Sequence, residues 1–565
     1  MRGPFDLTFA GAAAAFCLAS PADAALVVSK APSTNMHCDG NGCVATAADA
    51  VMNVNDLKLF LRAGNTSLGT ANVTDDIVID TPLSWANTHR LTFVAAHSIV
   101  IRKPIVVEGH GGLTLQDSAD GQGTGTIAYG PKGRIDFWDT HAGLTIDNQS
   151  YALAADVHGL EGTLSGRFLA LTKDYDAAQD GTYQQAPVAS FDFGVFDGLG
   201  HTISNLKIVD TAGSDNVGLF GSVDGSELKN IGLVDADVTG GDRAIVGALA
   251  GQSGGVARNV FATGSVHGGQ STVAGGLFGQ INGGQDFALP IQDSWSAVSV
   301  TADQNSVAGG FAGATQQNVQ LLRCHASGTV SLLAASTLSA LGGLVGAGSG
   351  ELQYSYATGA VTGGDGAHAG GLVGENGFTI WRSYAGGAVT GGADARVGGL
   401  VGEANSTVEI QQSYATGAVA GGDGAHAGGL FGNDWLATVR DTYATGAVAA
   451  GANGAAGGLA GEQNQVLSRS YSRGTVSGGA GSVVGGLIGN DFAHHRVSRT
   501  YWDTDTSGIA DPSQGAGNHK NANGITAMTS AELQAALPDG FSPSIWRIDP
   551  QINGGLPFLR HLPPN

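Results

Sequence analysis

The sequence is poor in charged residues, and the few charges it carries are mostly acidic. Charged side chains make up 13% of the 565 residues, and 48 acids against 26 bases leave a net charge of −22 at pH 7. Nucleic acid and anionic membrane surfaces repel such a protein, so neither is an expected partner. Beyond the first residues no apolar stretch reaches the length of a spanning helix, so we expect no membrane span.

The sequence also lacks the short motifs of common active sites. It has no His-Glu-x-x-His pair for zinc hydrolysis, no phosphate-binding loop and no dinucleotide fingerprint. Gly251–Gly255 matches the Gly-x-Ser-x-Gly pattern around Ser253, but no helix follows it in this glycine-rich stretch, so chance explains the match. We expect no catalytic residue and no cofactor.

Cysteine is scarce, with 4 residues in the chain. Cys38 and Cys43 enclose the flexible turn Asp39–Gly42, which favours a small disulfide in an oxidising compartment, with a two-cysteine metal site as the alternative. Cys324 is expected to be a small buried apolar residue.

The N-terminus has the features of a secretory signal peptide. Arg2 precedes the apolar run Ala10–Ala19, and Ala22–Ala24 forms an A-x-A cleavage site, so residues 1–24 are predicted to be removed. Cys17 follows Phe16, where a lipoprotein signal needs a small residue. The mature protein is therefore predicted to be secreted, extracellular or on the outer surface.

What the sequence has in abundance is a glycine-rich repeat. Ten blocks, most often Gly-Gly-Leu-Val-Gly, recur at intervals of 28 to 34 residues. A fixed period of this length predicts a stacked solenoid, in which each unit buries its apolar side against its neighbours. The central apolar residues are Leu219, Leu249, Leu277, Phe311, Leu344, Leu372, Leu400, Leu430, Leu459 and Leu487.

A second column runs in phase with the first and mostly holds an aromatic residue. Turn-forming stretches such as Gly363–Gly366 separate the two columns, and the 92 glycines of the chain disfavour helix. We predict an all-β fold, a parallel β-helix of right-handed coil, with leucine and valine inward and the tyrosines in an inner or corner stack. The column reads Leu233, Phe261, Trp295, His325, Tyr356, Tyr384, Tyr414, Tyr443, Tyr471 and Tyr501.

The Gly-Leu-Val-Gly blocks resemble the GLUG motif of bacterial secreted and surface proteins. Phe191–Leu206 resembles the lead-in of these arrays, and Tyr501–Gly508 and Asn553–Leu559 resemble their exit. Residues 80–116 resemble the β-helical part of filamentous-haemagglutinin-like adhesins, although the Asn-Pro motifs of adhesin secretion domains are absent. The resemblance implies an adhesin-type surface protein, but similar arrays also accompany some secreted peptidases.

Five segments follow from these patterns. They are a signal peptide (1–24), an N-terminal segment with a short capping helix (25–75), a β-helical, haemagglutinin-like region with the lead-in (76–210), the GLUG solenoid (211–505) and a C-terminal cap (506–565). Residues 25–52 are expected to be extended or loosely ordered.

Short helices are predicted as caps at both ends. Asn55 is expected to cap a helix with Leu57, Phe60 and Leu61 on its apolar side, ending at Gly64. Near the other end, Thr529–Glu532 has the spacing of a capping box. Leu533, Ala536 and Leu537 form the apolar side of that helix, and Trp546, Ile548, Leu556, Phe558 and Leu559 are expected to form a lid over the last coil.

Possible metal ligands are isolated along the chain. His368 and His426 occupy equivalent positions with Arg396 between them, about 9–10 Å apart at the spacing of stacked strands, and are read as surface residues. His494 and His495 have no further ligands nearby in sequence. Asp503 and Asp505 open a stretch like a calcium loop, but position 12 is Gln514 rather than glutamate.

The leading prediction is a secreted, non-catalytic β-solenoid that acts as a monomeric surface adhesin or matrix-interaction protein with an unknown protein or glycan ligand. One alternative is a carbohydrate-active enzyme, a polysaccharide lyase or hydrolase, on the same fold. Such enzymes need convergent carboxylates beside a basic residue, and the acids here are thinly spread. A passive surface-layer or biofilm scaffold is the other alternative.

Overall fold

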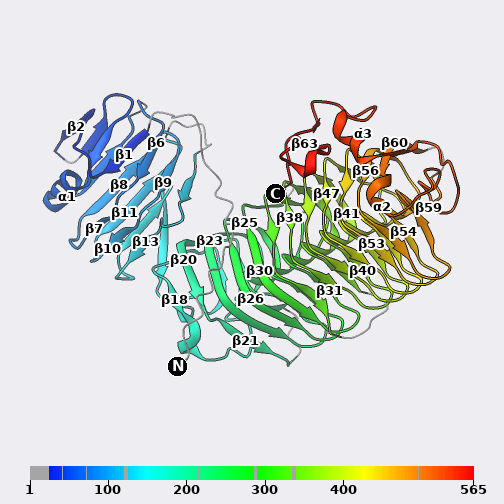
Figure 1. Cartoon of the computed structure of the whole chain (residues 1–565). Helices are drawn as coiled ribbons and strands as arrows, with labels where there is room; N and C mark the ends of the chain where they lie inside the picture. The colour runs from blue at the N-terminus through cyan, green and yellow to red at the C-terminus, as the bar shows by residue number, and fades with distance from the viewer. Residues whose placement is uncertain are drawn as a thin grey trace, which may run out of the picture. The chain divides into compact units, whose positions relative to one another are not determined.

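The computed structural model describes residues 25–40, 42–71, 73–119, 125–212, 216–284, 289–333, 339–493 and 496–564. The predicted signal peptide and the pair His494 and His495 lie outside these residues. The chain folds as two units that divide after Ser150. Both are stacks of parallel strands (Figure 1), so the all-β, parallel β-helix prediction is confirmed, while the hand of the coil stays a prediction. The boundaries predicted at 75, 210 and 505 lie inside these units.

Unit 1 is a short solenoid with three sheets. Their strand orders are β4-β1-β6-β9-β12, β7-β10-β13 and β2-β3-β5-β8-β11-β14. All neighbours are parallel except the β2–β3 hairpin. The elements are β1 (Ala25–Ser29), β2 (Met36–Asp39), β3 (Gly42–Ala45), β4 (Val51–Asn53), α1 (Val54–Ala63), β5 (Thr66–Gly69), β6 (Asp76–Ile79), β7 (Leu83–Trp85), β8 (Arg90–Val94), β9 (Ile99–Ile101), β10 (Ile105–Val107), β11 (Gly112–Gln116), β12 (Ile127–Tyr129), β13 (Ile135–Phe137) and β14 (Gly143–Ile146).

Of the two alternatives predicted for residues 25–52, extended or loosely ordered, the described residues are extended. They contribute β1 to β4, and alternate residues of β1 such as Leu26 and Val28 are fully buried. The helix is capped by Asn53 rather than Asn55, through a 2.9 Å hydrogen bond from the Asn55 amide to the Asn53 side chain. Helix α1 follows β4 and precedes β5. In the later turns the equivalent place between the first and third sheets is taken by β7 and β10 of the second sheet, so α1 stands where this sheet would have a strand.

Unit 2 begins with a lead-in of less regular turns. Its elements are β15 (Gln149–Ala154), which starts at the boundary, η1 (His158–Leu160), β16 (Gly162–Ser165), β17 (Phe168–Leu171), β18 (Tyr175–Asp176), η2 (Ala177–Asp180), β19 (Val188–Asp192), β20 (Val195–Ser204), β21 (Lys207–Asp210) and β23 (Phe220–Gly240).

Ten repeats then stack in register. Each begins with a short strand of one ten-stranded sheet, and this strand ends just before the apolar residue of the glycine-rich block. The ten apolar residues of these blocks, from Leu219 to Leu487, are all fully buried. The sheet contains β22 (Asn216–Val217), β24 (Ile245–Gly247), β27 (Val273–Gly275), β31 (Val307–Gly309), β36 (Ala340–Gly342), β40 (His368–Gly370), β44 (Arg396–Gly398), β49 (His426–Gly428), β54 (Ala455–Gly457) and β58 (Val483–Gly485).

Two further columns of strands complete each turn. The first, directly after the apolar residue, holds β25 (Ala250–Arg258), β28 (Phe278–Ile281), β29 (Leu289–Gln292), β32 (Ala312–Thr315), β33 (Val319–Leu322), β37 (Val345–Gln353), β41 (Val373–Trp381), β45 (Val401–Ala404), β46 (Glu409–Gln411), β50 (Phe431–Asp434), β51 (Thr438–Arg440), β55 (Ala460–Gln463), β56 (Leu467–Ser472), β59 (Ile488–Asp491) and β60 (Val497–Asp503). The second, which starts at the aromatic column, holds β26 (Phe261–Gly268), β30 (Trp295–Ala302), β34 (His325–Ala326), β35 (Val330–Leu332), β38 (Tyr356–Ala357), β39 (Val361–Thr362), β42 (Tyr384–Ala385), β43 (Val389–Thr390), β47 (Tyr414–Ala415), β48 (Val419–Ala420), β52 (Tyr443–Ala444), β53 (Val448–Ala450) and β57 (Val476–Gly478).

Glycine is required where successive blocks approach each other. A Cβ atom on Gly371 would lie 2.1 Å from the carbonyl oxygen of Gly399, and one on Gly399 would lie 2.1 Å from that of Gly429. A side chain at Gly371 or Gly399 would therefore separate the rungs, although the second block has Ala248 at the equivalent position.

The chain ends in a segment that folds back onto unit 2. Its elements are α2 (Thr504–Ser507), β61 (Ile525–Met528), α3 (Ser530–Ala535), β62 (Trp546–Arg547), η4 (Asn553–Gly555) and β63 (Phe558–Leu559), which pairs antiparallel with β62. Helix α3 has the predicted capping box, in which Thr529 and Glu532 bind each other's backbone amides.

Candidate binding face

The aromatic column forms a continuous stack of rings along unit 2. From Phe261 to Tyr471 neighbouring ring centroids lie 4.6–6.0 Å apart, with interplanar angles of 4–12°. Each ring covers the faces of its neighbours, so solvent or a partner meets the ring edges. We call this stack, together with Tyr501, which pairs in register with Tyr471, the aromatic ladder.

The start of the ladder differs from the prediction. Leu233 is not its first member, because the strand register pairs Gly232 with Phe261 and Leu233 with Ala262. Leu233 is fully buried inside the coil. A Cβ atom on Gly232 would lie 2.1 Å from the Phe261 ring, so that ring lies against a glycine and the stack begins at Phe261.

A buried column of hydroxyl groups fixes the backbone one residue before the ladder. The Ser355 amide donates to the Ser383 hydroxyl at 3.1 Å, and the Ser383 amide donates to the Ser413 hydroxyl at the same distance. Cys324 occupies this column and is fully buried, as its sequence position suggested, and burial raises the pKa of its thiol to about 12. The other fully buried members are Ser294, Ser355, Ser383, Ser413, Thr442, Ser470 and Thr500.

Two residues before the ladder, every rung turns through a residue with positive φ. None of the ten is glycine, and their φ angles lie between 47° and 56°, a region that non-glycine residues rarely adopt. We call them the corner column. They are Asn230, Asn259, Asp293, Arg323, Tyr354, Arg382, Gln412, Asp441, Arg469 and Arg499.

The corner column carries charged pairs between successive rungs. Arg323 binds both carboxylate oxygens of Asp293, at 2.6 and 2.7 Å, and Arg469 binds those of Asp441, at 2.9 and 2.7 Å. Sequence analysis missed this column, although the recurrence of asparagine, aspartate and arginine at one position of the period was a usable signal. The charges therefore lie directly beside the aromatic ladder.

The C-terminal segment covers one half of the ladder. The prediction of a lid over the last coil is wrong, because the segment extends back along the side of the solenoid over four rungs. Figure 1 shows it in red beside β47 and β56. We call Tyr414, Tyr443, Tyr471 and Tyr501 the covered ladder and the half-buried Phe261, Trp295, His325, Tyr356 and Tyr384 the open ladder. The cover packs through Leu533, Phe541, Trp546, Leu556 and Leu559.

The cover binds the ring edges with aromatic groups and backbone carbonyls. The Trp546 ring lies 6.0 Å from Tyr443 and 6.1 Å from Tyr471, tilted by 53° and 56°. The Trp546 indole N–H donates to Asp441 at 3.2 Å, and the Tyr471 hydroxyl donates to the Pro557 carbonyl at 2.7 Å. The covered ladder thus shows that an indole ring and backbone carbonyl groups can bind the ring edges of this face.

A second polar cluster lies at the glycine-rich corner. His368, Arg396 and His426 are stacked in register, so Arg396 separates the two histidines as expected. They are not simple surface residues, since the side chains are 24%, 34% and 29% exposed and pair with glutamates. Glu403 lies 2.8 Å from His368 and 3.2 Å from Arg396, and Glu462 lies 3.2 Å from His426.

This cluster corrects the view that acids are spread too thinly to converge. Burial of Glu403 raises its pKa, but the His368 hydrogen bond and the two cationic neighbours outweigh burial, and the net shift is downward. Glu403 is therefore ionised at neutral pH and unsuited to act as a general acid. Within the described ranges no group of three or more histidine, cysteine, aspartate or glutamate residues could hold a metal ion.

The remaining catalytic patterns fail on geometry. Ser253 is 1% exposed within strand β25, so it has no nucleophile elbow. In unit 1, Asp76 and Ser98 both contact Nδ1 of His97, at 3.0 and 2.9 Å. A Ser-His-Asp relay uses the two opposite ring nitrogens, so this trio cannot pass a proton from serine to aspartate.

The predicted cysteine pair and the calcium-like stretch at Asp503 and Asp505 both have structural roles. Cys38 and Cys43 are joined by a disulfide across the β2–β3 hairpin. Asp503 caps α2 and accepts a 2.6 Å hydrogen bond from the Ser530 hydroxyl, while Asp505 accepts one from the Ser530 amide at 3.0 Å. Both carboxylates thus bind the helices of the C-terminal segment.

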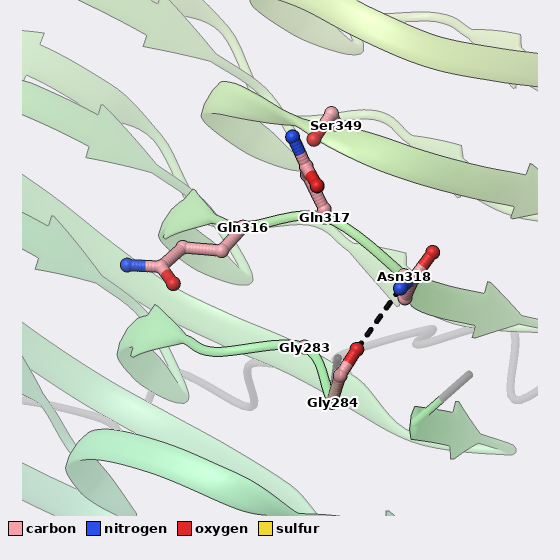
Figure 2. Close-up of a pocket in the computed structure, with 6 residues that line it drawn as sticks. All are labelled: Gly283, Gly284, Gln316, Gln317, Asn318 and Ser349. Atoms are coloured by element: carbon pink, nitrogen blue, oxygen red, sulfur yellow. Dashed lines mark hydrogen bonds between the residues drawn. The ribbon is translucent and has the colours of Figure 1, made fainter. Parts of the chain in front are cut away.

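A shallow pocket of about 620 Å³ opens beside β28, β32 and β37. Figure 2 shows the Asn318 amide donating to the Gly284 carbonyl across it, at 2.9 Å. The described residues of its lining include no titratable side chain. The lining residues are Gly283, Gly284, Gln316, Gln317, Asn318 and Ser349.

Comparisons with known proteins show no family for this chain. No protein-family model matches the chain. Halomucin from Haloquadratum walsbyi is 36% identical over 177 residues, which span 30% of this chain and 2% of Halomucin. A solved structure, a candidate immunoglobulin A1 protease from Bacteroides ovatus, is 16% identical and covers 73% of this chain and 92% of its own, with a TM-score of 0.30. Among the described residues, no helix combines the length and apolar character needed to cross a bilayer.

Proposed function

We propose that this protein is a secreted, non-catalytic β-solenoid of the GLUG-repeat adhesin type, which binds a protein or glycan at a cell surface or in an extracellular matrix. The observation that carries the proposal is the open ladder, a row of half-buried ring edges beside the charged corner column. Tyrosine, tryptophan and arginine, which occur together on this face, are the residues most enriched among binding hot spots. The predicted signal peptide and the Cys38–Cys43 disulfide support an oxidising, extracellular location.

The enzyme alternative has less support from the described residues. A glycoside hydrolase needs a carboxyl group that is protonated and reaches substrate. Burial raises the pKa of Asp434 to about 7, but this side chain is fully buried. The Glu403 side chain is only 12% exposed, and its pKa is lowered. Neither combines the two properties.

The proposal is tested by binding of the mature protein to immobilised matrix proteins, mucins and polysaccharides. Thr358 is exposed two residues after Tyr356, so Thr358→Arg places a long charged side chain beside the open ladder without removing a ring. Thr362 is exposed in the same rung but lies further from the ladder, and Thr362→Arg is the matched control.

We expect at least one ligand whose affinity falls tenfold or more in Thr358→Arg and is unchanged in Thr362→Arg. Equal binding by both variants would mean that the open ladder takes no part in ligand binding. Release of oligosaccharide products from the polysaccharides would favour the enzyme instead, and absence of any ligand would favour a passive scaffold.

A further inference from the structure

The corner residues and rings that bind Trp546 occur a second time in unit 2. Asp441 stands two residues before Tyr443, and its arginine partner Arg469 stands two residues before Tyr471. Five rungs earlier, Asp293 stands two residues before Trp295, and its partner Arg323 stands two residues before His325. In both places arginine binds both oxygens of the aspartate of the preceding rung. The backbone of both sites also follows the same register, with aspartate and arginine at positive φ.

The two copies differ in what lies against them. Where the cover is present, the Asp441 side chain is 3% exposed, whereas the Asp293 side chain is 45% exposed. The two arginines have similar exposures, 29% for Arg469 and 34% for Arg323. The rings beside Asp293 lie 6.0 Å apart and are half-buried. The second copy therefore has the acid, the arginine and the ring edges, and its acid lies open to solvent.

We propose that Asp293, Arg323, Trp295 and His325 form a docking site for a tryptophan side chain on an extended segment of a partner protein. The inference rests on the proposed function and narrows its ligand to a polypeptide. The tryptophan ring lies against the two ring edges as Trp546 does, and its indole N–H donates to Asp293. A backbone carbonyl of the segment accepts from the Tyr356 hydroxyl one rung after His325, as the Asp539 carbonyl accepts from Tyr501 one rung after Tyr471.

A partner protein, rather than a second copy of this chain, is the expected occupant. Trp546 is fully buried on its own ladder, and Leu533, Leu556 and Leu559 of the same segment are at most 2% exposed. The cover would have to leave this packing and expose its tryptophan to solvent before it could occupy another molecule.

The test uses the full mature chain and a labelled synthetic peptide of residues 538–564 as the probe. Peptide binding is measured by fluorescence anisotropy, and its location by hydrogen exchange. We expect micromolar affinity with protection in residues 289–302 and 319–326, a peptide carrying Trp546→Ala that binds at least tenfold more weakly, and an Asp293→Asn protein that binds the original peptide at least threefold more weakly.

Asp365 is an exposed acid at a different corner, so Asp365→Asn is the matched control and should bind normally. The inference is overturned if the peptide does not bind, if Trp546→Ala does not weaken it, or if protection changes only in residues 438–472, which would indicate exchange with the cover. It is also overturned if the chain dimerises through its own cover. Loss of matrix binding in Thr358→Arg together with no peptide binding would retain the proposed function and exclude the polypeptide ligand.

Discussion

The open and covered halves of the aromatic ladder share one backbone and differ in their rings and their neighbours. The covered half contains only tyrosine, whereas the open half contains phenylalanine, tryptophan, histidine and tyrosine. Ring spacing is nevertheless similar, 4.6 Å between His325 and Tyr356 and 4.8 Å between Tyr414 and Tyr443. Strand register therefore sets the stack, and any flat ring satisfies it.

The difference lies in what the ring edges bind. In the covered half two tyrosine hydroxyls donate to carbonyls of the C-terminal segment, Tyr471 to Pro557 and Tyr501 to Asp539, at 2.7 and 2.8 Å. A phenylalanine in these rungs would remove the tyrosine donor to Asp539 and one of the two donors to Pro557, whose carbonyl also accepts from the Asn553 side chain at 3.0 Å. In the open half Phe261, Trp295 and His325 carry no hydroxyl, so carbonyls of the cover do not set the ring type at these three rungs.

The largest effect is expected from a substitution that detaches the C-terminal segment and so exposes the covered half of the ladder. Trp546 is fully buried against Tyr443 and Tyr471, so Trp546→Ala should weaken docking of the C-terminal segment by about 3–5 kcal/mol. Hydrogen exchange of residues 530–562 should accelerate, while exchange of residues 261–356 stays unchanged.

Trp138 in unit 1 is 71% exposed, and Trp138→Ala serves as the control for loss of an indole. Unchanged protection of the C-terminal segment in Trp546→Ala would mean that the tryptophan does not hold the cover in place.

The next effect concerns His325, the histidine ring of the open half. Burial lowers the pKa of His325 to about 4, from an ordinary value of 6.5. Between these values the unfolded chain binds a proton that the folded chain does not, so stability falls as pH falls from about 6.5 to about 4, by at most about 3 kcal/mol. His325→Tyr, which restores the tyrosine of the covered half, should remove this loss in denaturant unfolding followed at several pH values.

Asp434 has the opposite effect on the pH dependence of stability, so its contribution must be measured separately from that of His325. Burial raises its pKa from 3.8 to about 7, so its contribution to stability rises as pH falls from about 7 to about 4. Asp434→Asn should remove that rise and leave the His325 effect intact. A His325→Tyr protein with the same pH profile as the parent would show that the ring stack does not perturb this histidine.

Much of the array could be predicted because the sequence interval between equivalent residues follows directly from the register of the stacked strands. The leucine column and the tyrosines of the ladder recur at nearly constant intervals, and constant intervals superpose in a solenoid. Features that depend on contacts between columns could not be read this way. The pairing of His368 with Glu403 joins residues from adjacent rungs, and no single repeat shows it.

The errors have physical causes of the same kind. Leu233 was aligned by spacing, but the register shifts between Leu233 and Ala236, which moves Gly232 into the ladder. The path of the C-terminal segment depends on Trp546 fitting between two rings, and spacing along the chain does not encode it.

The smallest expected effect separates two tyrosines of the covered half that differ only in their hydroxyl partners. The Tyr471 hydroxyl donates to Pro557 and accepts from the Asn553 side chain at 2.8 Å, whereas within the described chain the buried Tyr443 hydroxyl has no hydrogen-bond partner. Tyr471→Phe should therefore cost about 1 kcal/mol of cover docking, and Tyr443→Phe should be neutral or slightly stabilising. Exchange rates of residues 553–559 measure both. Each substitution keeps the ring and removes one oxygen. Equal effects would therefore mean that ring packing alone holds the cover in place, and that the carbonyl contacts do not distinguish the covered half from the open one.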